Sequence, residues 1–111
     1  MISGAHAMIF TNDEAADRAF LRDVLEIPCI DSGGGWLIFK LPPTELGVHS
    51  GDNGFHQIYF ICDDADAFVA SMAEKGVEAL PISEEDWGRR TGVTLPGGGT
   101  LGIYQATHAR P

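Results

Sequence analysis

The sequence has few basic residues, few cysteines and no long apolar run. Only 7 lysine and arginine residues stand against 16 acidic residues, which gives a formal net charge of −9. A surface of that sign repels phosphate backbones and anionic lipid headgroups, so we expect neither nucleic acid nor a membrane as a partner. No apolar stretch approaches the ~20 residues that a membrane-spanning helix needs.

The N-terminal residues and the cysteines indicate a cytoplasmic protein. Residues 1–6 lack the basic region and apolar stretch of a signal peptide. Cys29 and Cys62 show neither metal-type spacing nor the pattern of a disulfide framework. We therefore expect free, buried thiols in a reducing compartment.

The chain contains a repeat of about half its length. Residues 57–68 (QIYFICDDADAF) follow the pattern of residues 6–17 (HAMIFTNDEAAD), so that His6 falls on Gln57. Each segment begins as an apolar run of strand length, reaches an acidic pair suited to cap a helix, and continues at helical spacing. A chain of 111 residues buries roughly 65% of its unfolded surface, enough for one core. We expect a single domain over residues 1–111, with modules at about 1–53 and 54–111 that share this core.

The first module is predicted to contain one strand, one helix and three further strands, in that order. The helix begins after Asn12 or Asp13 and Pro28 ends it, with Asp17 on its outer side. The predicted strands span residues 4–10, 29–31, 36–41 and 45–50.

The second module repeats this order. Asp63 or Asp64 is expected to cap its helix, and Gly76 to follow the last turn. The acidic segment 83–88 is predicted to be a loop. The predicted strands span residues 57–62, 77–82, 90–95 and 100–105.

Three stretches resemble the vicinal oxygen chelate superfamily, which includes glyoxalase I, bleomycin-resistance proteins, fosfomycin-resistance proteins and extradiol dioxygenases. Residues 6–27 resemble its opening strand, acidic cap and helix, and residues 62–80 resemble the matching part of its second module. Residues 87–89 (WGR) and 95–105 (LPGGGTLGIYQ) resemble its Trp-Gly step and final hairpin. The resemblance implies an α+β fold in which two βαβββ modules form a curved mixed sheet around a cavity, often in a homodimer.

Strand alternation places candidate site residues on one face. It groups His6, Met8 and Phe10, which the repeat maps onto Gln57, Tyr59 and Ile61. The segments 46–49 (LGVH) and 101–104 (LGIY) likewise pair His49 with Tyr104. We expect polar side chains from both modules to meet in one cavity. The candidate metal ligands are His6, His49 and Gln57, and the candidate ligand contacts are Met8, Phe10, Tyr59 and Tyr104.

The resemblance implies a divalent metal, but the ligand set departs from the family pattern. Imidazoles suit iron, zinc, nickel or manganese, and Gln57 is a weaker ligand in the place of a histidine. The glutamate that family members usually carry in the final strand falls on Gly102. This departure removes both a ligand and the expected general base, so it disfavours glutathione-dependent glyoxalase chemistry.

Two functions of different classes therefore stay open. The first is a metal-dependent lyase, isomerase or dioxygenase that acts on a small molecule with vicinal oxygens, which the metal polarises as a Lewis acid. The second is a metal-free protein that captures a drug or metabolite in an apolar, aromatic cavity, as bleomycin-resistance proteins do. Whether the protein is an enzyme depends on which of the two applies.

Overall fold

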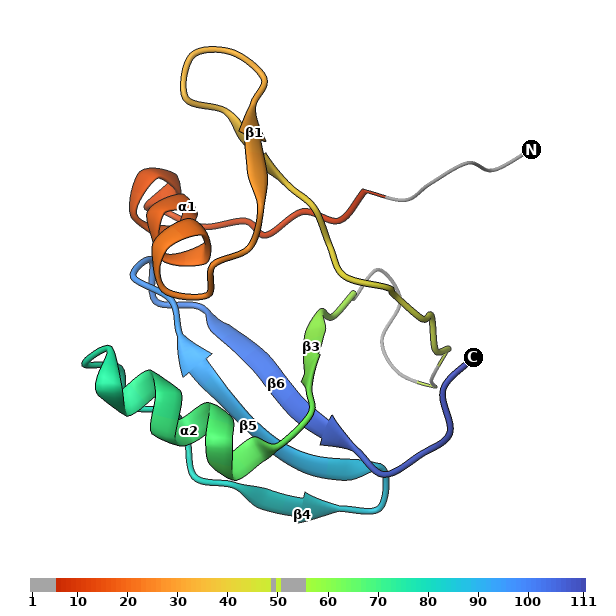
Figure 1. Ribbon diagram of the computed structural model, residues 1–111. Coiled ribbons are helices and arrows are strands. Elements are labelled where there is room, and N and C mark those ends of the chain that lie inside the picture. Colours follow the sequence, from red (N-terminus) through yellow and green to blue (C-terminus); the bar gives the residue numbers. More distant parts are fainter. Residues whose placement is uncertain (1–5, 49, 51–55) are drawn as a thin grey trace.

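The computed structural model describes residues 6–48, 50 and 56–111, which form two helices, a two-stranded hairpin and a four-stranded sheet (Figure 1). No helix in these ranges is long and apolar enough to cross a membrane. In chain order the elements are α1 (Glu14–Asp23), β1 (Cys29–Asp31), β2 (Leu37–Phe39), β3 (Tyr59–Cys62), α2 (Ala65–Glu74), β4 (Ser83–Glu85), β5 (Gly88–Thr94) and β6 (Thr100–Ala106).

The second module has the predicted order of strand, helix and three strands. Its sheet runs β3-β6-β5-β4, with β3 parallel to β6 and the other pairs antiparallel. Helix α2 follows β3 and leads to β4. Its cap is Asp64, whose Oδ1 accepts from the Ala67 amide at 3.1 Å, and Gly76 follows the helix with φ of 75°. The predicted cap and helix end are both confirmed.

One strand of this module lies where the sequence predicted a loop. We predicted a strand at 77–82, but β4 is at Ser83–Glu85, inside the acidic segment. Its carboxylates face basic residues of β5, and Glu84 pairs with Arg89 across the ladder at 2.8 Å. Opposite charges on neighbouring strands favour this pairing. Pro81 has no amide to donate to a strand at 77–82.

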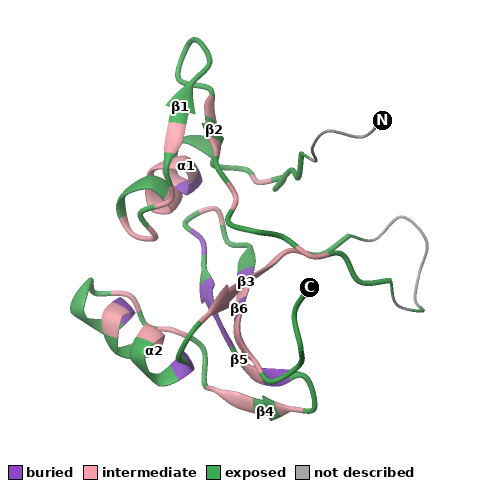
Figure 2. Cartoon of the chain, turned by 45° about the vertical axis from the view of Figure 1, so that its right-hand side comes forward, coloured by how far each residue is buried: buried purple, intermediate pink, exposed green. Residues whose placement is uncertain are grey.

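The core lies between the four-stranded sheet and both helices. Met72, Val93, Leu95, Leu101 and Ile103 are each 3% exposed or less. Four apolar residues of the first module pack against this cluster: Phe20, Leu21, Val24 and Leu25. Side chains of α1 and of the residues just after it therefore pack against the core of the four-stranded sheet. Figure 2 shows the buried residues gathered in the sheet and helices, whereas the β1–β2 hairpin is largely exposed.

The first module contributes α1 and a short hairpin. Asp13 caps α1, with its Oδ1 accepting from the Ala16 amide at 3.2 Å. The predicted strand at 29–31 is confirmed as β1, and the strand predicted at 36–41 shortens to β2. The helix ends at Asp23, earlier than the boundary that Pro28 predicts, because the chain turns at Glu26, where φ is 56°.

Two predicted strands of the first module are not formed in the described residues. Segments 6–10 and 45–48 carry no strand, while residues 4 and 5 and His49 lie outside the described residues. A strand needs a neighbour for its amide and carbonyl groups, and the described part of the chain supplies none to these segments. Apolar side chains stay exposed as a result: Phe10 is 92%, Leu46 93% and Val48 95% exposed.

Candidate ligand-binding site

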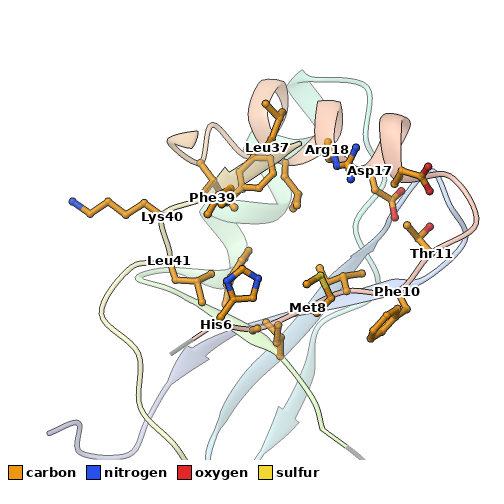
Figure 3. A pocket seen from close by; sticks show the side chains of 18 of the residues that line it. His6, Met8, Phe10, Thr11, Asp17, Arg18, Leu37, Phe39, Lys40 and Leu41 are labelled. Atoms are coloured by element: carbon orange, nitrogen blue, oxygen red, sulfur yellow. The ribbon is translucent and has the colours of Figure 1, made fainter. Parts of the chain in front are cut away.

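A cavity of about 1170 Å³ lies between α1, the N-terminal segment, β2 and β3 (Figure 3). Most of the residues that line it are apolar. They include Met8, Phe10, Leu21, Trp36, Leu37, Phe39, Leu41, Ile58 and Phe60. A concave, mainly apolar cavity with a few polar groups is the usual form of a small-molecule site, and this volume suits a drug-sized ligand.

The polar groups around the cavity come mainly from α1 and the segment before it. Thr11, Glu14, Asp17 and Arg18 contribute to its lining. The guanidinium carbon of Arg18 lies 4.7 Å from the ring centroid of Trp36, within the range of a cation–π contact.

Asp17 is buried, although the sequence placed it on the outer side of the helix. It is 5% exposed, and its Oδ1 accepts from the Gly97 amide at 2.7 Å. The Pro96–Gly99 turn between β5 and β6 packs against α1 here, so the amide of the turn needs an acceptor. The assignment to the outer side was wrong because helical spacing alone does not show where a turn from the other module lands.

A second group of side chains forms what we call the aromatic cluster: Tyr59, Trp87 and Tyr104. The three rings meet edge to face, with centroid separations of 5.7, 5.7 and 4.9 Å. Gln57 Nε2 donates to the Tyr59 hydroxyl at 3.3 Å. The cluster joins β3 and β6 to the residue before β5.

Tyr104 connects the aromatic cluster to the C-terminal residues. His108 Nδ1 lies 2.8 Å from the Ala109 carbonyl, which can only accept, so in the neutral imidazole Nε2 accepts from the Tyr104 hydroxyl at 2.9 Å. Glu45 contacts both His108 and Arg110, at 3.6 and 3.2 Å. Burial and the negative charge of Glu45 raise the pKa of Tyr104 above its usual value.

The structure distributes the predicted site residues over two places. His6, Met8 and Phe10 line the cavity, whereas Gln57, Tyr59 and Tyr104 lie in or beside the aromatic cluster. The side chains of an extended chain alternate between two faces, which explains why the predicted site residues lie in two places. Phe60 of β3 and Ile58, just before it, line the cavity, whereas Tyr59 between them faces the other way. His49 lies outside the described residues. Asp17 was not among the predicted site residues. Gly97, which contacts it, is 80 residues away in the sequence, so no pattern of neighbouring residues indicates the contact.

Among the described side chains there is no group of three or more His, Cys, Asp or Glu residues that could hold a metal ion. Gly102, at the position of the family glutamate, lies against the Tyr59 ring, and a Cβ added there would overlap two ring carbons. A carboxylate at this position therefore requires the ring to move.

The fold matches three solved structures. It is similar to TnmS3, an antibiotic binding protein from Streptomyces sp. CB03234, with a TM-score of 0.66 and 19% identity over 96% of this chain and 100% of that one. It is similar to a lactoylglutathione lyase from Agrobacterium tumefaciens, with a TM-score of 0.64 and 17% identity over 87% and 88% of the chains. It is also similar to a structure from the mobile metagenome of V. Pseudocholerae, with a TM-score of 0.59 and 12% identity over 97% and 99%.

These similarities confirm the fold that the sequence resemblance implied. The chain has the glyoxalase and bleomycin-resistance fold, an α+β fold with a mixed sheet. No protein-family model and no curated protein sequence matches the chain. Proteins of one fold carry different functions, so the function is argued from the site.

Proposed function

We propose that the protein binds a small apolar molecule in the cavity between α1, β2 and β3, without a metal ion. The observation that carries this choice is the contact between Tyr59 and Gly102. The ring fills the space that a metal-binding carboxylate in the last strand would need. Metal-dependent lyase, isomerase or dioxygenase chemistry is therefore the less favoured function.

The cavity supports the binding function directly. Met8 and Trp36 are 48% and 46% exposed, so both offer apolar surface to a ligand. Covering apolar surface stabilises a complex by about 25 cal/mol per Å² before the costs of association. Phe10 and Met8 remain proposed ligand contacts, and the contacts predicted for Tyr59 and Tyr104 would require a ligand on the aromatic cluster.

The similar solved structures include one binding protein and one enzyme, the same two classes of function that are considered for this chain. TnmS3 is described as an antibiotic binding protein, and the Agrobacterium tumefaciens protein as a lyase. The similarity to each is one of fold, so neither decides the function of this chain. The Tyr59–Gly102 contact favours the first type.

We also propose that the protein acts as a cytoplasmic homodimer. The unpaired segments 6–10 and 45–48 expose the apolar side chains of Phe10, Leu46 and Val48. A second copy of the chain is a source of neighbouring strands and apolar surface for these segments. Light scattering after size exclusion tests this part of the proposal, and a monomer at all protein concentrations would contradict it.

A neutral fluorescent probe tests the binding function. N-acetyl-dansylcadaverine brightens when its naphthalene ring enters an apolar site, and we expect it to bind the purified protein. The two tryptophans provide a matched pair, because Trp36 lines the cavity and Trp87 belongs to the aromatic cluster.

We expect Trp36→Ala to weaken binding roughly tenfold, the loss of about 1.4 kcal/mol of contact. Trp87→Ala should change the affinity less than about twofold, since its ring lies outside the cavity. The reverse pattern would place the ligand on the aromatic cluster. Absence of binding by the unmodified protein would contradict the proposed function.

A further inference from the structure

We propose that the cavity takes ligands that carry a primary or secondary amine, and that Asp17 binds the ammonium group. This inference rests on the proposed function, because it names the chemical class of ligand for the same cavity. Asp17 lines the cavity and is 5% exposed, and its Oδ2 has no hydrogen-bond partner in the described structure.

The two oxygens of Asp17 differ in what they contact. The Gly97 amide satisfies Oδ1 at 2.7 Å and fixes the carboxylate against the β5–β6 turn. Oδ2 is buried without a donor. Buried carboxylate oxygens are ordinarily hydrogen-bonded, because losing water without gaining a donor is costly. An ammonium group supplies a donor and a compensating charge together.

Thr11 also lines the cavity, near the buried Oδ2 of Asp17. Figure 3 shows the Thr11 and Asp17 side chains next to each other at one end of the cavity. The Thr11 hydroxyl accepts from the Asp13 amide at 3.2 Å, a single contact that is easily exchanged. Because Oδ2 is buried, an ammonium group reaches it only if neighbouring side chains move, and Thr11 can rotate between its staggered positions.

The charges around the cavity favour a cation at this end. Arg18 directs its guanidinium over the Trp36 ring, and Figure 3 shows the Lys40 ammonium group pointing away from the other lining side chains. Glu14 adds a second carboxylate to the lining. The net charge of −9 attracts cationic ligands from solution as well.

Two probes that differ only at one nitrogen test the inference. Dansylcadaverine carries a primary amine, and its N-acetyl derivative carries a neutral amide on the same arm. We expect the unmodified protein to bind the amine roughly tenfold or more tightly, as befits a hydrogen bond to a charged group. Equal affinities for the two probes would overturn the inference and leave the proposed function standing. Failure of both probes to bind would overturn both.

The variant Asp17→Asn isolates the carboxylate. Asparagine keeps an acceptor for the Gly97 amide, so the contact between helix and turn is retained while the charge is lost. We expect the preference for the amine to fall to about twofold or less, with unchanged affinity for the N-acetyl probe. Asp63→Asn, the same change at an exposed position outside the cavity, should retain the preference.

A preference that persists in Asp17→Asn would overturn the role of Asp17. Thermal unfolding of both variants establishes that they are folded at the assay temperature. If Asp17→Asn does not fold, the comparison of the two probes on the unmodified protein still decides the ligand class.

Discussion

The ring of Tyr59 lies on Gly102, its partner in the neighbouring parallel strand. The two Cα atoms are paired in the β3–β6 ladder, and the ring occupies the volume of a Cβ at position 102. An aromatic side chain over a strand glycine restores the packing that the glycine lacks. The same contact closes the position from which the family resemblance expects a metal-binding glutamate.

Gly102→Ala should therefore destabilise the protein, because the new methyl group displaces the Tyr59 ring. We expect a loss of about 1–3 kcal/mol in the free energy of unfolding, measured by urea titration. In a Tyr59→Ala background the same change should cost much less, since the ring is gone. Equal costs in the two backgrounds would show that the ring does not occupy this volume.

Gly97→Ala should loosen the contact between α1 and the β5–β6 turn. A Cβ at position 97 would overlap the Thr11 hydroxyl and come within 3.0 Å of the Asp17 carboxylate. We expect a loss of about 1–3 kcal/mol in unfolding free energy.

Gly99→Ala is the matched control for this change, because a Cβ there meets no atom within 4 Å. Its effect should stay within about 0.5 kcal/mol. Similar costs at both positions would indicate that the backbone of the turn does not tolerate a side chain, independently of the contact with α1.

The phenol of Tyr104 should ionise at a higher pH than a free tyrosine. Burial raises its pKa first, and the negative charge of Glu45 raises it further. The neutral phenol is thus the form that the fold favours. Its contribution to stability is complete below the unfolded pKa of about 10 and is lost as pH rises through the folded value.

Ultraviolet difference titration of the unmodified protein against Tyr104→Phe measures this pKa. Glu45→Gln should lower it, because the variant removes the second cause of the shift. A pKa that does not respond to Glu45→Gln would contradict the electrostatic part of this prediction.

Cys62 should react slowly with alkylating reagents at neutral pH. Both cysteines are free and half-buried, and burial raises the pKa of the Cys62 thiol, so little thiolate is present. Iodoacetamide labelling of a Cys29→Ser variant should be slower than labelling of the same variant unfolded in urea, and should accelerate as pH rises. Equal rates for the folded and unfolded forms would contradict the prediction.

Local signals in the sequence predicted the second module well. Asp64 and Gly76 mark the two ends of α2. Both ends could be predicted because helix capping and a left-handed backbone conformation depend on single residues. The order of strand, helix and three strands was likewise predicted from hydrophobic periodicity and turn residues. The repeat carried these expectations to both halves of the chain.

Contacts between distant segments could not be predicted in the same way. The burial of Asp17 depends on Gly97, which comes from the other module. Strand β4 was not predicted because two of its three residues are glutamates, and these pair with Arg89 and Arg90 of β5. The predicted site residues lie in two places in the structure. Alternation shows which side chains of a strand share a face, but it does not show which face lines the cavity.

Chelation tests the central claim, capture of a ligand without a metal ion, most directly. Protein purified without chelator is assayed with N-acetyl-dansylcadaverine before and after dialysis against EDTA, with iron, zinc, nickel and manganese quantified in both samples. We predict that the affinity after chelation is unchanged within about twofold. Binding that disappears on chelation and returns when one of these metals is restored would contradict the account.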